Sequence, residues 1–421
     1  MAYECSPYRG SEWAVGWGRL LQAAREFETH VVTSEKNFAA LERARGEGLV
    51  PSNVQFYTPE PDAKLRELEG KPVLFAYNYT AYHQWQRLAY VLVCELHAKE
   101  RFDVVHQVNV ATFREPGYAW QLGIPFLWGP VGGSQNFPVR FLTMLPAVEA
   151  FKELLRGVSN RVSLRWKRRV RDAAKNAAML VAANSTNRRD YERVFGRRVE
   201  LLLETGLAKV EAPDRRRFHA RVAEKGARPL RILWSGEFQS RKALPLLLKA
   251  LAAVKAEVNF ELRVLGDGPM EQRWRGEVER LRLGERVEFM GRLPFTEAVA
   301  QMEWAELFCF TSLRDTSGNV VLEALAAGVP VVCFNHQGAG DMVSETSGVK
   351  LAVSSPRRAV EDWARTIREL AGNPDRLLQL SEGTTEQARK FLWETNGDRV
   401  NAAYLRLEQD WRTLNDARMR R

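Results

Sequence analysis

The chain has 421 residues, 45% of them hydrophobic, which is typical of a globular protein too long for a single ordinary core. Four cysteines without a CxxC pair argue against disulfides and zinc and predict a reducing compartment. The net charge of +10 favours an anionic ligand or surface, and the absence of an apolar run of about 18 residues argues against a membrane span.

The first predicted helix follows a loop around Pro7 and Gly10. Helical, amphipathic spacing begins after Ser11, which is placed as its cap. Only Met1–Cys5 precede the loop, too few for a complete strand. We therefore expect either a shortened first strand or a true start upstream.

Two further strands are predicted in FDVVHQVN and IPFLWGPVGGSQNFP, and both end in polar or glycine-rich loops. His106 lies at the end of the first strand, where a neutral imidazole could hydrogen-bond a sugar hydroxyl. We take it as a candidate catalytic residue. The alternative is a histidine satisfied by nearby backbone.

The densest basic segment spans 156–175, where cations surround Trp166 with helical spacing. Such a segment suits an anionic membrane surface, with the cations near headgroups and the indole at the interface. A solvated helix face is the alternative. Nucleic acid is not expected as a partner, because no recognition motif accompanies the charges.

A polar stretch divides the chain into two domains. We predict an N-terminal domain over 1–212, a linker over 213–228 and a C-terminal domain over 229–387. Residues 388–421 form a tail with helical spacing.

The second half alternates strands with helices, which predicts a parallel sheet. The runs LRILWSGEF, FELRVLGDGPM and RVEFMGRLP end in glycine at Gly236, Gly266 and Gly291. Ligands of parallel sheets bind beyond the carboxyl ends of the strands, where these glycines fall.

Arg241 and Lys242 follow the first of these glycines, at the start of a predicted helix. Two cations there oppose the helix dipole unless an anion lies beside them. A phosphate group would remove the conflict. An exposed basic pair is the alternative reading.

The most informative stretch is 310–334, where Asp315 follows an apolar run and Glu323 lies on the next helix. The turn between the two carboxylates offers cap-type side chains and a flexible backbone. An anion can bind the free amides at such a helix start. The donor-binding candidates in this turn are Ser317, Gly318, Asn319 and Val320.

The motifs GEFQSRKA, VLGDGP, FMGRL and DTSGNVVLEALAAGVPVV, in this order and spacing, resemble the nucleotide-sugar domain of family 4 of the retaining glycosyltransferases. The resemblance covers roughly 231–352. It implies the α/β GT-B fold, in which two Rossmann-like, doubly wound domains face each other across a cleft. It also implies that the tail crosses back to the N-terminal domain.

The family motif is Glu, seven residues, Glu, and here Asp315 stands in the first place. The resemblance implies that Asp315 addresses the transferred sugar and Glu323 the ribose, while Arg241 and Lys242 hold the diphosphate. The remaining roles it implies are backbone amides toward the diphosphate for Gly318 to Val320, a glycine loop toward the donor phosphates for Gly10, and a place near the base for Arg292.

The sequence therefore predicts a retaining glycosyltransferase that moves a hexosyl or related sugar from a nucleoside diphosphate sugar to a hydroxyl of a glycan or lipid-linked acceptor, as in polysaccharide biosynthesis. No metal or other cofactor is expected, because no Asp-x-Asp signature is present. The expected location is the cytoplasm, with peripheral binding to the inner face of the membrane. A pseudoenzyme that binds nucleotide sugar or glycan, and a Rossmann oxidoreductase, remain as alternatives.

Overall fold

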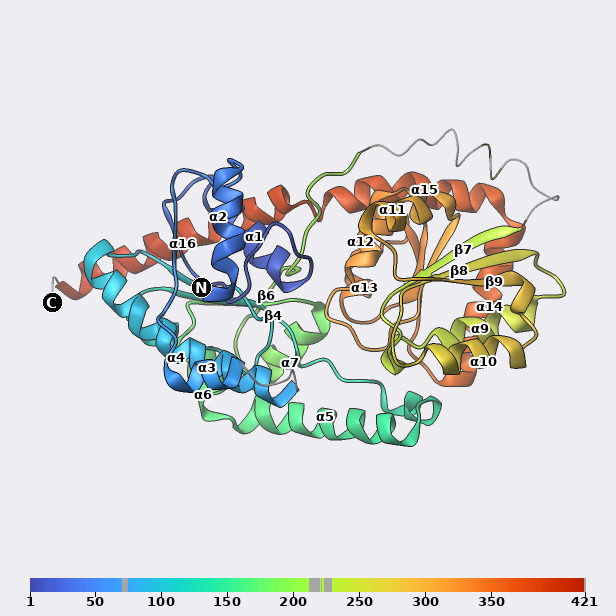
Figure 1. The fold of residues 1–421 in the computed structure, drawn as a ribbon, viewed down its shortest axis with the longest axis horizontal. Helices are drawn as coiled ribbons and strands as arrows, with labels where there is room; N and C mark the ends of the chain where they lie inside the picture. Colours follow the sequence, from blue (N-terminus) through green and yellow to red (C-terminus); the bar gives the residue numbers. More distant parts are fainter. Residues whose placement is uncertain (70–74, 212–219, 221, 223–228, 420–421) are drawn as a thin grey trace. The chain divides into compact units, whose positions relative to one another are not determined.

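The computed structural model describes residues 1–69, 75–211, 220, 222 and 229–419, and the chain forms two compact units (Figure 1). Unit 1 comprises Met1–Ser134, Asn160–Gly206 and Trp393–Arg421. Unit 2 comprises Gln135–Ser159 and Leu207–Leu392. The predicted linker 213–228 lies outside the described residues, apart from positions 220 and 222.

The strands of unit 1 are β1 (Thr29–Val32), β2 (Val54–Tyr57), β3 (Val105–Gln107), β4 (Phe126–Val131), β5 (Met179–Ala182) and β6 (Glu200–Leu201). Its α-helices are α1 (Glu12–Ala23), α2 (Phe38–Gly46), α3 (Ala63–Glu69), α4 (Phe75–Glu100), α6 (Arg168–Asn176), α7 (Ser185–Phe195) and α16 (Trp393–Met419). Two short 3-10 helices, η1 (Glu35–Asn37) and η2 (Ala119–Gln121), also belong to it.

The strands of unit 2 are β7 (Leu230–Ser235), β8 (Phe260–Leu265), β9 (Val287–Gly291), β10 (Leu307–Phe310), β11 (Val331–Phe334) and β12 (Gly348–Leu351). Its α-helices are α9 (Leu244–Val254), α10 (Glu271–Arg280), α11 (Phe295–Trp304), α12 (Asn319–Ala326), α13 (Gln337–Met342), α14 (Pro356–Gly372) and α15 (Pro374–Arg389). Its 3-10 helices are η3 (Val139–Met144), η4 (Ser240–Lys242) and η5 (Gly284–Arg286). Helix α5 (Ala147–Trp166) contains the division between residues 159 and 160.

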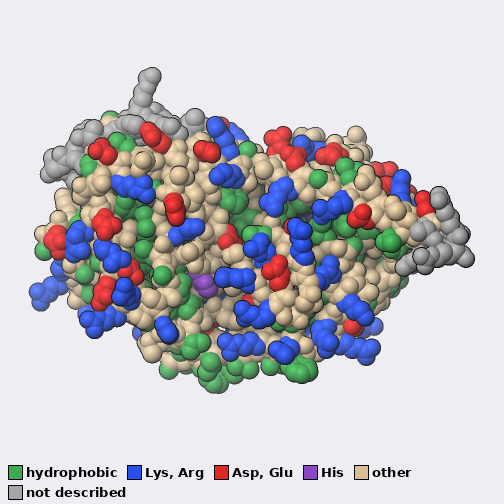
Figure 2. All heavy atoms as spheres, turned by 180° about the vertical axis from the view of Figure 1, so that it is seen from behind, with side chains coloured by type: hydrophobic (Ala, Val, Ile, Leu, Met, Phe, Trp, Pro, Cys, Tyr) green, Lys and Arg blue, Asp and Glu red, His purple; other side chains and the backbone are tan. Residues whose placement is uncertain are grey.

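The surface reflects the basic composition of the chain, and Figure 2 shows Lys and Arg side chains spread over the face that it draws. Among the described residues, no helix is both long enough and apolar enough to cross a bilayer.

Unit 1 is built on parallel strand pairs. Strands β3, β4, β5 and β6 form one sheet in that order, and β1 pairs with β2. The segment Met1–Tyr3 lies between these groups, because the Ala2 amide donates to the Val32 carbonyl (2.9 Å) and the Val108 amide donates to the Met1 carbonyl (3.0 Å). These residues stand where a Rossmann-like sheet has its first strand.

Unit 2 contains a six-stranded parallel sheet in the order β12-β11-β10-β7-β8-β9. The strand order changes direction at β7: β8 and β9 lie on one side of it, and β10, β11 and β12 lie on the other, as in a doubly wound fold. Strands β10 and β11 are buried at every position, which explains their uninterrupted apolar sequences. Loops that follow the strands therefore meet at one edge of the sheet.

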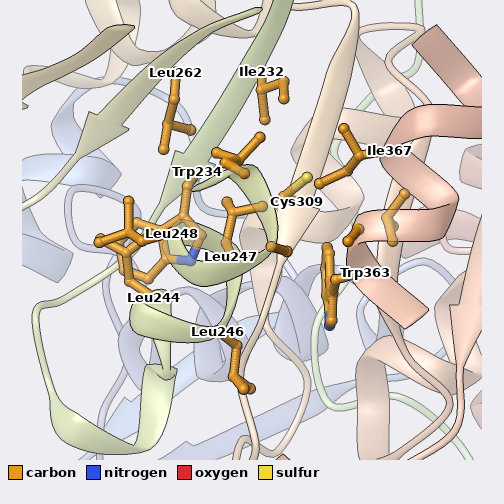
Figure 3. Packing of buried hydrophobic residues seen from close by; sticks show 14 of the residues in the cluster. Ile232, Trp234, Leu244, Leu246, Leu247, Leu248, Leu262, Cys309, Trp363 and Ile367 are labelled. Atoms are coloured by element: carbon orange, nitrogen blue, oxygen red, sulfur yellow. The ribbon is translucent and has the colours of Figure 1, made fainter. Parts of the chain in front are cut away.

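The core of unit 2 forms because α9 is apolar on nearly all sides and packs against both the sheet and α14. Figure 3 shows side chains of β7, α9, β10 and α14 meeting in this core. The labelled residues include Trp234 of β7, Leu247 of α9, Cys309 of β10, and Trp363 and Ile367 of α14.

The structure corrects one part of the predicted division. Residues 135–159, placed by the sequence in the N-terminal domain, group with unit 2. The reason is hydrophobic, since Phe137 and Phe141 are buried in the core of unit 2, and the Phe141 ring meets Phe334 edge-on at 6.2 Å. The chain therefore enters unit 2 before it completes unit 1.

Gly266 illustrates how tightly the strand ends pack. It follows β8 with a φ of +123°, and a Cβ there would lie 2.1 Å from the carbonyl oxygen of Gly236. Its amide also donates to the Gly291 carbonyl at 2.8 Å. These contacts account for a glycine at this position without any ligand.

We predict that Gly266→Ala lowers the free energy of unfolding by about 3 kcal/mol, because both the φ angle and the Cβ clash oppose any side chain. Gly276→Ala is the matched control, since this glycine lies within α10 and a Cβ there would meet nothing. The control should gain up to about 1 kcal/mol from helix propensity. Urea unfolding of the three proteins checks both values, and equal midpoints would contradict the packing argument.

Candidate functional site

The carboxyl edge of the unit 2 sheet brings together two cations and a carboxylate that are distant in sequence. Lys242, at the end of η4, pairs through Nζ with Oδ2 of Asp315, which follows β10. Arg241 Nη1 lies 3.5 Å from the other oxygen, Oδ1. The anion that the sequence required beside these cations is thus supplied by Asp315 itself. Two cations against one carboxylate still leave the cluster net positive.

Burial and charge act in opposite directions on this cluster. Burial disfavours ionised Asp315, but attraction to Lys242 and Arg241 outweighs burial and holds the pKa of this carboxyl below its ordinary value. Burial lowers the pKa of Lys242, whose side chain is only 11% exposed, while Asp315 opposes that shift. Asp315 is therefore ionised at neutral pH.

The backbone around the cations is fixed by hydrogen bonds to the segment after β10. The Leu313 amide donates to the Arg241 carbonyl at 3.0 Å. The Thr311 hydroxyl donates to the Lys242 carbonyl at 2.6 Å, and the Trp234 indole donates to that hydroxyl at 2.9 Å. These hydrogen bonds fix the backbone from which both cationic side chains extend.

Asp315 is held by side chains for which the sequence predicted no role. Its amide donates to Oε1 of Gln337 at 2.6 Å, and the Ser312 hydroxyl donates to its Oδ2 at 3.3 Å. The neighbouring Arg314 forms a bidentate pair with Glu153 of α5, at 2.7 and 2.9 Å. Only the three-dimensional fold brings these partners together.

The start of α12 differs from the predicted cap. Gly318, with a φ of +84°, is the N-cap residue, and no side chain caps the helix. The hydroxyl of Ser317 instead donates to Asn319 Oδ1 at 3.3 Å. The Val321 amide donates to the Gly318 carbonyl at 2.9 Å, whereas the amides before it, including that of Val320, have no acceptor in the α-helical pattern. Lys242 Nζ and Gly318 flank the same ring, that of Phe310, so the cation and the helix start are neighbours.

Glu323 lies one turn into α12 and is half-buried. Burial alone raises its pKa, since no charged group is recorded as opposing that effect. Among the described residues, its carboxyl has no hydrogen-bond or ion-pair partner. Such a carboxyl is available to accept hydrogen bonds from a ligand.

Other predicted donor residues lie around the same edge. Gly236 and Gly266 form the close backbone contact described above. Arg292 follows β9 and makes a bidentate pair with Asp267, with atoms 2.8 to 3.2 Å apart. This pair is exposed, and the partner of Arg292 in it is Asp267 and not a residue of the Lys242 cluster.

The structure favours the alternative for His106, a histidine whose hydrogen bonds are satisfied inside the protein. Both ring nitrogens are engaged inside unit 1, because Nε2 donates to the Gly129 carbonyl and Nδ1 accepts from the Tyr404 hydroxyl of α16. Burial, together with nearby Arg19, lowers its pKa well below the usual value. His106 is a neutral core residue that fastens α16. Gly10 lies in the exposed loop before α1, also in unit 1, and its role toward the donor stays a prediction.

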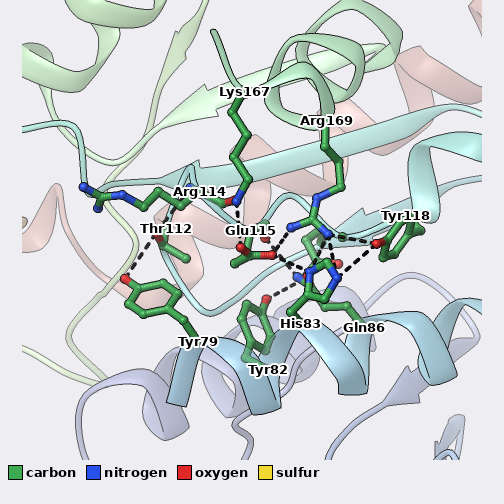
Figure 4. A network of polar contacts seen from close by, with 12 residues as sticks. Tyr79, Tyr82, His83, Gln86, Thr112, Arg114, Glu115, Tyr118, Lys167 and Arg169 are labelled. Carbon is green, nitrogen blue, oxygen red and sulfur yellow. Dashed lines mark hydrogen bonds and ion pairs between the residues drawn. The ribbon is translucent and has the colours of Figure 1, made fainter. Parts of the chain in front are cut away.

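The basic segment 156–175 is also divided by the structure. Lys167 Nζ donates to Oε1 of Glu115 at 2.8 Å, and Arg169 pairs with the other carboxylate oxygen. Figure 4 shows both cations converging on Glu115, with His83 and Tyr118 beside them. These two cations stabilise the interior of unit 1 and are not part of a free basic surface.

A family model described as Glycosyl transferases group 1 matches residues 215–391. This part of the chain is similar to that family. The group 1 segment contains every strand of unit 2 and the Asp315 cluster. The match gives no support to the oxidoreductase alternative.

Curated relatives agree with this family. A protein of Escherichia coli K12, named as a candidate colanic acid biosynthesis glycosyltransferase (WcaL), is 30% identical over 37% of this chain and 40% of its own length. A D-inositol 3-phosphate glycosyltransferase of Corynebacterium glutamicum is 26% identical over 41% of this chain and 42% of its own. The chain therefore spans less than half of each relative.

Solved structures resemble the whole chain. A sucrose-phosphate synthase of Thermosynechococcus elongatus has a TM-score of 0.64 at 17% identity, covering 95% of this chain and 94% of that one. WaaG, described as a glycosyltransferase of lipopolysaccharide biosynthesis, has a TM-score of 0.57 at 15% identity, covering 96% and 98%. The GT-B fold predicted from the sequence is confirmed.

We predict that Asp315→Asn destabilises the fold by about 1–3 kcal/mol at neutral pH, because it leaves Lys242 partly buried beside Arg241 without a full counter-charge. The folded-state pKa of Asp315 is depressed, so its contribution is present above the unfolded value of about 4 and is lost as pH falls through the folded value. The difference between wild type and variant should therefore shrink in acid.

Urea unfolding of both proteins over a pH series measures this difference. Asp267→Asn is the matched control, since it breaks an exposed pair at the same sheet edge and should leave stability nearly unchanged. A difference for Asp315→Asn that stays constant from neutral to acid pH would show that the carboxylate charge contributes nothing.

Proposed function

We propose that the protein transfers a hexosyl or related sugar from a nucleoside diphosphate sugar to a hydroxyl of a glycan or lipid-linked acceptor, with retention of configuration. The observation that carries this proposal is the Arg241–Lys242–Asp315 cluster beside the uncapped start of α12. Cations and free amides together suit a diphosphate group. The group 1 match supports the same class of donor.

In this proposal Arg241 and Lys242 stabilise the diphosphate as it leaves. Preorganised cations are effective for this purpose because they need no reorganisation when charge develops. Asp315 competes with the diphosphate for Lys242, since both are anions. Binding of the donor therefore requires Lys242 to share its hydrogen bonds between the two.

In this proposal the carboxylates of Asp315 and Glu323 recognise different parts of the donor. Asp315 lies beside the cations and addresses the sugar that departs, whereas Glu323 lies one turn along α12 and accepts from the ribose hydroxyls. The half-buried, unpaired carboxyl of Glu323 supports this assignment. Interactions made only while the sugar leaves lower the barrier, and those made equally throughout set affinity.

The names of similar proteins suggest the acceptor and the cellular location that we propose. One relative is named for colanic acid biosynthesis and one structural neighbour for lipopolysaccharide biosynthesis. We propose a surface polysaccharide or its lipid-linked precursor as acceptor, in the cytoplasm at the inner face of the membrane. A crystal structure of Anabaena HepE with UDP and glucose, at a TM-score of 0.58 and 15% identity, shows the same fold.

A pseudoenzyme remains the second candidate, and the pairing of Asp315 with Lys242 is what favours it. A carboxylate bound to a cation, and one methylene shorter than the family's glutamate, is less able to reach a sugar. Slow hydrolysis of UDP-glucose, UDP-N-acetylglucosamine or GDP-mannose by the purified protein would argue for the enzyme. Binding without any hydrolysis would argue for the pseudoenzyme.

We predict that Asp315→Asn strongly reduces donor hydrolysis while its affinity for UDP or GDP is unchanged or higher, because a competing anion is removed.

Glu323→Gln should weaken binding of the nucleotide, since the ribose is present in donor and product alike. Lys242→Ala should weaken it by about 1.5–3 kcal/mol. Calorimetric titration with UDP and GDP, beside the hydrolysis assay, measures each effect.

Lys249→Ala is the matched control for the cation, because Lys249 lies on α9 with a half-exposed side chain away from Asp315. It should bind nucleotide as wild type does. Full hydrolytic activity in Asp315→Asn, or unchanged nucleotide affinity in Lys242→Ala, would contradict the assigned roles.

We also propose that no resident metal is needed, since Arg241 and Lys242 supply positive charge where the diphosphate would bind. Donor hydrolysis should therefore survive excess EDTA. Loss of activity that magnesium or manganese restores would show that a metal completes the site.

A further inference from the structure

Helix α5 exposes an apolar stripe. Six large apolar side chains recur at helical spacing along it, and each is at least half exposed. We call them the outer stripe: Val148, Phe151, Leu155, Val158, Val162 and Trp166. Figure 2 shows hydrophobic side chains gathered along its lower edge, where α5 lies in Figure 1, with Lys and Arg side chains beside them.

The opposite face of α5, which we call the inner face, is small or polar and attaches the helix to the protein. Glu153 pairs with Arg314, and a Cβ at Gly157 would lie 3.7 Å from Asn136. Asn160 accepts from the Arg114 guanidinium, and Leu164 is buried. A surface helix normally turns its apolar face inward. Helix α5 is inverted, so its amphipathic pattern is directed at something outside the described chain.

Cations border the outer stripe on both sides. At 100° per residue, Lys152 and Arg156 fall along one border, and Arg161 and Arg165 along the other. Trp166 ends the helix, with an indole 69% exposed. An apolar stripe between two rows of cations, with an aromatic side chain at its end, has the composition of a helix that lies in a membrane interface.

We propose that α5 docks on an anionic lipid surface, with the outer stripe in the boundary between headgroups and acyl chains and its bordering cations near lipid phosphates. A second copy of the chain fits less well. Two such helices face to face would bring cationic borders against each other, which is repulsive. A bilayer instead presents apolar chains and anionic headgroups at the depths that the two parts of the helix require.

This proposal keeps Arg161, Arg165 and Trp166 of the predicted membrane segment 156–175 and changes other residues that act. Lys167 and Arg169 are used by Glu115, whereas Val148, Phe151 and Leu155 lie before that segment. It is also independent of the proposed sugar transfer, because no residue of the outer stripe belongs to the Asp315 cluster.

The test is flotation of the full chain with vesicles of phosphatidylcholine, alone or mixed with phosphatidylglycerol. The triple variant Phe151→Ser, Leu155→Ser, Val158→Ser removes the centre of the outer stripe. The matched control, Val91→Ser with Leu414→Ser, removes side chains of similar exposure, 57% and 56%, from α4 and α16. Arg161→Gln with Arg165→Gln tests the cationic border.

Wild type and the matched control should float with the mixed vesicles, and the triple variant should bind at least about tenfold more weakly. The arginine variant should lose most of the preference for phosphatidylglycerol. Thermal unfolding and UDP affinity of the triple variant should equal those of wild type, which separates this surface from the donor site.

Equal flotation of the triple variant and wild type would overturn the proposal, as would failure of wild type to bind the mixed vesicles. Light scattering that shows a wild-type dimer and a monomeric triple variant would also overturn it, and would assign the outer stripe to a second copy.

Discussion

The contact between Lys242 and Asp315 joins two loops that are 73 residues apart and decides the electrostatics of the whole sheet edge. Each group alone would be a poorly solvated charge. Together they allow two cations to stay beside a helix start. Strands β10 and β11 behind them are buried at every position, and close packing of this kind limits how far the charges can move apart. A ligand anion must enter an arrangement that is already partly neutralised.

The strand-to-helix turns of this site were predictable because short stretches of sequence determine them. An apolar run, a glycine and a helical run follow one another three times, and buried parallel strands require that pattern. Asp315 and Glu323 were found in the same way, since both lie near one strand-to-helix turn. Their surroundings were not predictable to the same degree. Gln337 and Glu153 approach the turn from other elements, and their contacts with it could not be read from the sequence.

His106 and 156–175 show why local reading was insufficient elsewhere. A histidine at a strand end has the same sequence signature whether it meets a ligand or a core hydroxyl, and its partner Tyr404 is 298 residues away. Lys167 and Arg169 read as surface charge until Glu115 is placed beside them. The periodicity of Val148, Phe151 and Leu155 was visible, but their direction depends on which face of α5 the fold accepts. The spacing of apolar residues shows that a helix has an apolar face, but only the packing of the folded chain decides whether that face points inward or outward.

The bidentate contact between Arg314 and Glu153 has a mechanical consequence. Arg314 directly precedes Asp315, and Glu153 lies on the inner face of the helix whose other face carries the outer stripe. Paired planar groups resist rotation and sliding more than a single hydrogen bond does. A force applied to α5 from outside thus reaches the carboxylate of the site through one side-chain pair and one peptide bond.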